Sequence, residues 1–223
     1  MLDSSKYVVL DVETNGLSPA TDDLLSISIY QPDTQNIYNK FLPLELNDKV
    51  FTTHINGITE KTLEGATALT QKDVDKLFED FGLKERIILT YGNFDEKCLN
   101  YYFGRKGLKG YKELRFFNIK RKILSSKYSN GAITKDSLCK VFKIPNVTKT
   151  HTGINDCILE WKLFEILYDR HIIITNDSVF EYNNDYILPV SYLTTYPNFK
   201  YLLQEYPQYT CNASEVKKNH HLQ

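Results

Sequence analysis

The spacing of hydrophobic residues along the chain predicts a mixture of strands and helices. Short apolar runs and period-two alternation, bounded by turn-forming residues, indicate strands at residues 7–13, 25–30, 36–42, 86–91 and 113–119. Apolar residues three or four positions apart indicate helices at residues 71–81, 94–103, 120–126, 136–142 and 155–168. Three consecutive strands, followed by alternating helices and strands, predict an α/β fold with a mixed sheet covered by helices.

The composition of the chain changes near residue 168. Residues 1–168 carry the predicted strands and helices, and we expect them to form one domain. Eight of the 16 tyrosines lie between Tyr168 and Tyr209, so residues 169–223 are expected to form a tyrosine-rich C-terminal extension. This extension could widen a binding groove, mediate self-association or recruit a protein partner, or complete the core, and the sequence does not separate these roles.

Composition and charge exclude several classes of protein. With 42% hydrophobic residues the 223-residue chain can bury a core, which excludes a disordered tail. The net charge of -1 argues against a generally basic nucleic-acid coat protein but leaves room for a local basic groove. The apolar runs fall short of the roughly 20 residues of a membrane span. The four cysteines form no Cys-x-x-Cys pair, so we expect reduced thiols and a cytoplasmic protein without membrane contact.

Two carboxylates stand two positions apart on the first predicted strand. Asp11 and Glu13 therefore project from the same face of that strand. On an apolar, central strand, desolvation and mutual repulsion would disfavour the pair, and a bound divalent cation would offset both effects. Carboxylate oxygens without nearby cysteine suit Mg²⁺ or Mn²⁺. The alternative is a strand end at which both acids are solvated.

Three further residues extend this acidic set. Asp95 follows Asn93 and Phe94 at the start of a predicted helix, and Asp156 stands at the start of another. Either could simply stabilise the positive end of its helix. His151 lies in the loop five residues before Asp156, and a histidine with a pKa near neutrality suits a general base.

Taken together, these residues resemble the DEDDh 3′→5′ exonucleases, the DnaQ-like family that includes the epsilon proofreading subunit of bacterial DNA polymerase III. The resemblance covers about residues 6–168 and is carried by four blocks, which are residues 10–19 (LDVETNGLSP), 54–59 (HINGIT), 93–95 (NFD) and 151–156 (HTGIND). In one departure, Thr90-Tyr91-Gly92-Asn93 stands where the family usually has a His-Asn pair.

The resemblance implies a fold and a set of roles. The fold would be RNase H-like, with a five-stranded sheet made of a three-stranded antiparallel meander plus parallel strands. Two Mg²⁺ or Mn²⁺ ions per active site would be held by Asp11, Glu13, Asp95 and Asp156, and His151 would remove a proton from the attacking water. The terminal nucleotide would contact Thr14, Asn15, Gly16, Leu17 and Phe94, although Leu17 and Phe94 could equally serve ordinary packing.

A basic segment suggests how the chain could hold a polyanion. Residues 105–127 contain nine Lys or Arg and a single acid, interleaved with aromatic residues, which is typical of a groove for a nucleic-acid strand. A solvated charged face is the alternative.

The predicted function is hydrolysis of phosphodiester bonds at the 3′ end of single-stranded or frayed nucleic acid, with DNA favoured over RNA and nucleoside 5′-monophosphates released. Two alternatives are a nucleic-acid-binding or scaffolding protein that recruits a partner through its C-terminal extension, and a metal phosphoesterase for small nucleotides.

Overall fold

The structure is a computed structural model, and it describes residues 2–122, 134–144, 152–169 and 173. By their contacts these residues fall into two compact units, the first of which comprises residues 3–118 and 152–161. Residues 2, 119–122, 134–144, 162–169 and 173 belong to the second. Nearly all of the predicted C-terminal extension, and His151, lie outside the described residues. Within the described ranges, no helix has the length and apolar character needed to cross a membrane.

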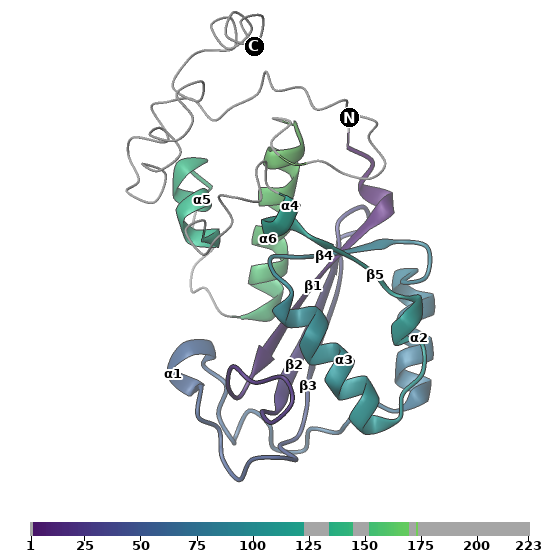
Figure 1. The fold of residues 1–223 in the computed structure, drawn as a ribbon, viewed down its shortest axis with the longest axis vertical. Helices are drawn as coiled ribbons and strands as arrows, with labels where there is room; N and C mark the ends of the chain where they lie inside the picture. Colours follow the sequence, from purple (N-terminus) through teal and green to yellow (C-terminus); the bar gives the residue numbers. More distant parts are fainter. Residues whose placement is uncertain (1, 123–133, 145–151, 170–172, 174–223) are drawn as a thin grey trace, which may run out of the picture. The chain divides into compact units, whose positions relative to one another are not determined.

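The first unit is built on a five-stranded sheet (Figure 1). Its strands are β1 Tyr7–Thr14, β2 Leu24–Gln31, β3 Asn36–Phe41, β4 Ile87–Thr90 and β5 Arg115–Asn118. Their order in the sheet is β3-β2-β1-β4-β5, in which β1, β2 and β3 form an antiparallel meander. Strands β4 and β5 continue the sheet in parallel to β1. The predicted mixed sheet is therefore confirmed, and β1 lies at its centre.

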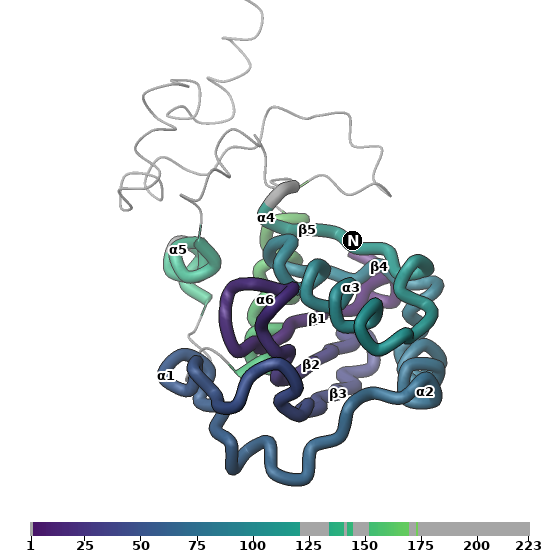
Figure 2. The backbone as a smooth tube through the Cα atoms, turned by 60° about the horizontal axis from the view of Figure 1, so that its bottom comes forward, coloured from purple at the N-terminus to yellow at the C-terminus, as the bar shows by residue number. Residues whose placement is uncertain are grey.

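One face of the sheet is covered by two helices, α2 Gln71–Phe81 and α3 Phe94–Lys106. Val8, Leu10 and Val12 alternate along β1 and share a buried cluster with apolar residues of both helices. Figure 2 shows the backbone paths of β1 and the two helices. Helix α2 begins with a capping box between Thr70 and Asp73, and it buries one apolar stripe, as its periodicity predicts. This core fixes β1, and with it the carboxylates on the opposite face.

The opposite face of β1 and β2 receives the first half of helix α6 Gly153–Asp169. The rings of Tyr7 and Trp161 have centroids 6.3 Å apart. Near the start of the helix, the Cys157 thiol donates to the Ser28 carbonyl at 3.6 Å. Because Tyr7, Asp11 and Glu13 project from the same side of β1, the helix begins over the two acids.

The second unit contains short helices and the end of α6. Helix α4 spans Ile119–Lys122, so that residues 123–126 of the predicted helix lie outside the described part. Helix α5 Lys135–Val141 begins with a capping box formed by Thr134 and Ser137. After α6, the amide of Ile173 donates to the Leu167 carbonyl at 3.4 Å.

Several boundaries differ from the predicted ones. Helix α6 starts at Gly153 rather than at residue 155, so Asp156 stands in its first turn. The predicted strand at residues 113–119 is shortened because Tyr111–Glu113 forms a 3-10 helix. A second 3-10 helix, Ser4–Lys6, and the four-residue helix α1 Thr53–Asn56 are not predicted, since elements this short show no periodicity.

Candidate metal and catalytic site

Three carboxylates converge on one face of the sheet. Asp11 and Glu13 come from β1 and Asp156 comes from α6, and each offers an oxygen atom within 4.8 Å of the others. We call these residues the acid group. Asp156 is only 3% exposed and the other two are half-buried, so their negative charges repel one another in a partly desolvated place. Such a set of hard oxygen donors fits Mg²⁺ or Mn²⁺.

The register of the sheet explains how the two strand acids are presented. In the antiparallel pairing of β1 with β2, Asp11 lies opposite Ser28 and Glu13 lies opposite Ser26. Both serines are fully buried, at 0% and 2% exposure. Because the serine side chains beside the acids are small, they protrude little from this face of the sheet, and the start of α6 can come close to the strands.

The fourth predicted acid contacts β1 in a different way. Asp95 stands in the first turn of α3, and its Oδ1 accepts a hydrogen bond from the amide of Val12 at 3.2 Å. Val12 lies between Asp11 and Glu13, so Asp95 adjoins the acid group without being one of its three members. The suggestion that Asp95 serves only its own helix is incomplete, because its carboxylate reaches the neighbouring strand.

A buried thiol lies in α3 close to Asp95. Burial, and then the negative charges of Asp95 and Asp22, raises the pKa of Cys98 to about 12. The thiol is therefore protonated at neutral pH, which disfavours a role as a nucleophile or metal ligand. The three described cysteines are free and buried, in agreement with the expectation of reduced thiols.

The residues after β1 bind a loop of the protein. The side chain of Asn15, 2% exposed, donates to Asn47 Oδ1 at 3.1 Å and to the Lys49 carbonyl at 2.8 Å. Its oxygen accepts from the Phe51 amide at 2.6 Å. The Thr14 carbonyl accepts from Thr52 Oγ1 at 2.8 Å. These bonds hold residues 44–51, which we call the anchored loop, and the start of α1 beside the end of β1.

Gly16, Leu17 and Phe94 show three different environments. Gly16 lies against the Asp22 carboxylate, and its carbonyl accepts from Thr14 Oγ1 at 2.7 Å. The Leu17 side chain is 90% exposed, so core packing does not explain it. Phe94 is half-buried and packs against the core under α2 and α3. Among the predicted nucleotide contacts, Leu17 is therefore the one presented most openly to solvent.

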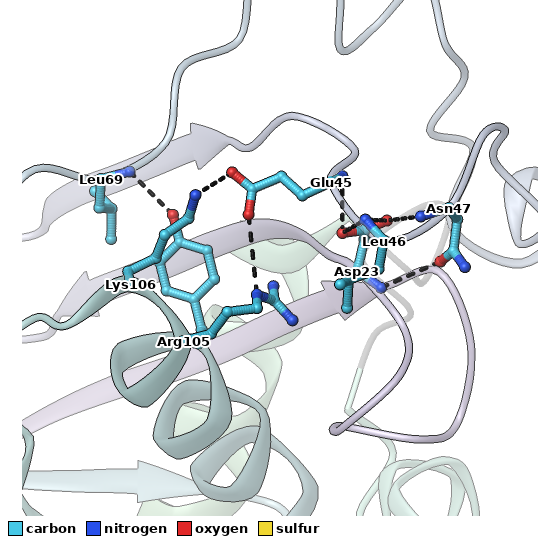
Figure 3. Close-up of polar contacts among 8 residues, drawn as sticks. Asp23, Glu45, Leu46, Asn47, Leu69, Arg105 and Lys106 are labelled. Carbon is cyan, nitrogen blue, oxygen red and sulfur yellow. Dashed lines mark hydrogen bonds and ion pairs between the residues drawn. The ribbon is translucent and has the colours of Figure 1, made fainter.

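A buried acid that the sequence does not distinguish fixes the anchored loop. Asp23 is 1% exposed, and its carboxylate accepts from the backbone amides of Glu45, Leu46 and Asn47 at 2.9–3.1 Å (Figure 3). Glu45 also pairs with Lys106 and lies 3.9 Å from Arg105, both at the end of α3. The only signal in the sequence is an aspartate directly before a strand, which is too common to predict this role.

Two other predictions fall partly or wholly outside the described residues. His151 lies outside them, as do residues 123–127 of the predicted basic segment. Within the described part of that segment, Arg105 and Lys106 pair with Glu45, and Arg115 donates to the Glu85 carbonyl. Lys109 and Lys112 are exposed, as are Arg105 and Arg115. The basic groove stays a prediction.

The sequence matches the Exonuclease family model, RNase_T, over residues 8–164. It is also 34% identical over 110 residues to a PolC-type DNA polymerase III of Streptococcus pyogenes serotype M18 (strain MGAS8232). That alignment covers 48% of this chain and 7% of the polymerase. The chain thus spans a small fraction of the length of the curated relatives that it matches.

Solved nuclease structures share the fold. The nuclease domain of 3′hExo, described as a DEDDh family member bound to rAMP, superposes with a TM-score of 0.60 at 17% identity, over 78% of this chain and 96% of that one. Exonuclease I of E. coli in complex with a dA16 oligonucleotide gives 0.52 at 15% identity, over 74% and 43%. Such identities speak for the fold alone, and they confirm the predicted RNase H-like architecture.

Proposed function

Because the chain belongs to the Exonuclease (RNase_T) family, as its match over residues 8–164 shows, we propose that it is a metal-dependent exonuclease of the DEDDh (DnaQ-like) type that acts at 3′ ends. The observation that carries the proposal is the acid group, since three carboxylates from distant parts of the chain lie within 4.8 Å of one another. We propose single-stranded or frayed substrates and nucleoside 5′-monophosphate products.

The roles of the acidic residues follow from their contacts. Asp11, Glu13 and Asp156, which share one face, would hold the divalent ions together with Asp95, whose carboxylate is positioned by its bond to the Val12 amide. Two bound Mg²⁺ or Mn²⁺ ions supply an activated water and neutralise charge at the phosphorus and the leaving oxygen. We assign His151 as the base that takes the proton from water, because histidine is the side chain whose unperturbed pKa lies closest to neutrality.

The end of β1 would position the substrate. Leu17 is exposed beside the acid-bearing strand, which suits an apolar contact with an unpaired terminal base. Thr14 and Asn15 would contribute by holding the anchored loop, and Gly16 by its close turn against Asp22. Phe94 would line the pocket from the start of α3. Residues 1–168 would be the catalytic domain, and residues 169–223 an extension that contacts a partner or a second copy.

The test is a panel of oligonucleotides incubated with the full chain and either metal. Because one similar structure contains rAMP and another dA16, the panel includes single- and double-stranded RNA and DNA. Each oligonucleotide is labelled at its 5′ end in one sample and at its 3′ end in another. We expect a ladder from 5′-labelled strands, immediate release of labelled mononucleotide from 3′-labelled strands, and no reaction in EDTA.

Two variants make the assignment specific to the acid group. Asp11→Asn should abolish most hydrolysis, whereas Glu79→Gln, which changes an exposed acid on α2, should leave the rate unchanged. Degradation from the 5′ end, or full activity of Asp11→Asn, would refute the proposal. Tight binding of strands without cleavage would instead favour a scaffolding protein. Hydrolysis of small nucleotide esters alone would favour a phosphoesterase.

A further inference from the structure

The first residue of α6 has no room for a side chain. A methyl group at Gly153 would come well inside 3.0 Å of Ser28 Oγ and within 2.9 Å of Ser28 Cβ. The next atom that it would meet is Asp11 Oδ2, at the ordinary contact distance of 3.4 Å. Gly153 is therefore packed directly on β2, beside an oxygen of the acid group.

The lack of room for a side chain, and not the backbone conformation, explains why residue 153 is a glycine. The described glycines with left-handed backbone are Gly57, Gly65, Gly82, Gly107 and Gly110, and Gly153 is not among them. Any residue could adopt its backbone angles, and alanine is a much better helix former. A glycine here opposes the local preference for helix, so the close approach to Ser28 is the physical reason for it.

Ser28, the residue on which Gly153 packs, is fixed by contacts with its neighbours. Ser28 is completely buried, and its Oγ lies 3.1 Å from Asn39 Oδ1 on β3. Ser28 stands opposite Asp11 in the register of β1 and β2. Its carbonyl accepts a hydrogen bond from the thiol of Cys157, which lies one turn after Gly153 in α6. Helix α6 thus touches Ser28 at two successive turns, and neither the strand nor the serine can withdraw easily.

We propose that Ser28 and Gly153 are matched positioning residues that set the distance between α6 and β2, so that Asp156 joins Asp11 and Glu13. Asp156 stands three residues after Gly153 in the same turn, so an outward shift at Gly153 moves its carboxylate away from the group. The inference rests on the proposed function to the extent that the acid group binds divalent ions.

The test measures Mn²⁺ affinity of the purified full chain by electron paramagnetic resonance, without any substrate. The variants are Gly153→Ala alone and combined with Ser28→Ala or Ser28→Gly, together with both serine variants alone. Ser28→Ala removes Oγ but leaves the 2.9 Å contact with Cβ, whereas Ser28→Gly removes both atoms. The matched control is Gly104→Ala on α3, where a methyl group meets nothing within 4 Å.

We expect Gly153→Ala to weaken Mn²⁺ binding by about 10–100-fold, as the loss of a positioning contact at a metal site does. Ser28→Ala should restore part of the affinity. The double variant Gly153→Ala/Ser28→Gly should bind Mn²⁺ with an affinity within about twofold of the Ser28→Gly single variant. This is the agreement expected when two substitutions no longer clash and act independently. Gly104→Ala should bind Mn²⁺ like the parent chain.

Two results would overturn the inference. One is parent-like affinity in Gly153→Ala, and the other is an affinity loss that Ser28→Gly does not restore. Thermal unfolding without metal is measured in parallel, because Gly153→Ala could fold poorly. Recovery of both folding and affinity in the double variant supports the pair, and failure to recover refutes it. If the parent chain itself binds no Mn²⁺, the proposed function fails, and this inference fails with it.

Discussion

Asp23 and Asp156 are both buried carboxylates in the same unit, at 1% and 3% exposure, and they differ in the groups close to them. Asp23 is surrounded by backbone amide donors, which stabilise its negative charge and fix the anchored loop. Asp156 lies within 4.8 Å of two other carboxylates. Burial alone therefore does not mark a functional acid, and the character of the neighbouring groups does.

This difference has an energetic consequence. Amide donors around Asp23 make the folded state depend on that carboxylate, because its removal would leave buried N–H groups without an acceptor. Like charges around Asp156 work against the folded state unless a cation binds. We therefore expect substitutions at the two residues to have opposite signatures in stability and activity.

The largest expected effect is the loss of hydrolysis in Asp156→Asn. Removing one ligand from a site that stabilises transition-state charge should lower kcat on a labelled oligonucleotide by about 10³-fold. The free energy of unfolding without metal should stay equal or rise, because one of three like charges is gone. Urea unfolding in EDTA checks the second part. A variant that is active, or that is destabilised to the same degree as Asp23→Asn, would contradict the comparison.

Asp23→Asn should show the reverse pattern. The amide of asparagine cannot accept all the backbone N–H groups that the carboxylate accepts, so we expect a loss of about 2–3 kcal/mol in the free energy of unfolding. Asp48→Asn, an exposed substitution in the same loop, is the control and should change stability by less than about 0.5 kcal/mol. If the two variants unfold at equal urea concentrations, Asp23 is not an anchor.

Leu17→Ala tests an exposed residue beside the same strand. Loss of its apolar contact should lower kcat/KM on single strands about tenfold, in the range for one lost apolar contact. Because the side chain is 90% exposed, stability should be unchanged. Ile37→Ala, 54% exposed on the edge strand β3, controls for any loss of surface apolar area. Equal effects of both variants on kcat/KM would remove Leu17 from the substrate site.

The smallest expected effect concerns a carboxylate stabilised by a side-chain cation. Asp33 forms a two-bond pair with Arg86, at 2.9 and 3.0 Å. This hydrogen bonding lowers the pKa of Asp33 from 3.8. Because the pKa of Asp33 is lower in the folded than in the unfolded state, the pair with Arg86 adds about 1 kcal/mol to the free energy of unfolding above pH ~4. This contribution is lost as the pH falls through the folded-state pKa.

Urea unfolding between pH 7 and pH 2.5 measures this contribution. Asp33→Asn should be less stable than the parent at pH 7 and should approach it at the acid end. Asp80→Asn, which breaks the exposed pair with Lys76, is the control and should give a smaller difference at pH 7. A constant difference between Asp33→Asn and the parent at every pH would show that the charge of Asp33 is not responsible.

Much of the fold could be predicted from the sequence. The strands and the longer helices follow from apolar spacing, because burial on one face imposes a period of two or 3.6 residues. Asp11 and Glu13 could be singled out because alternation places them on one face of an otherwise apolar strand. That Asp156 would meet them was implied by a family resemblance, since no local pattern relates α6 to β1.

The remaining features depend on contacts between distant segments. The bond from Val12 to Asp95, the packing of Gly153 on Ser28, and the loop held by Asp23 each join residues far apart in the chain. Serine, glycine and aspartate at these positions look locally like ordinary strand, helix-start and turn residues. Only the three-dimensional register shows that they determine where the carboxylates lie.

The position of α6 in the chain order has a consequence for synthesis. The five strands found among the described residues all precede residue 119, so a growing chain contains this sheet, together with Asp11 and Glu13, before Asp156 has been translated. The third carboxylate is supplied by a helix that leaves the ribosome afterwards. A nascent or prematurely terminated chain therefore holds only two of the three acids, and translation order itself delays assembly of the centre.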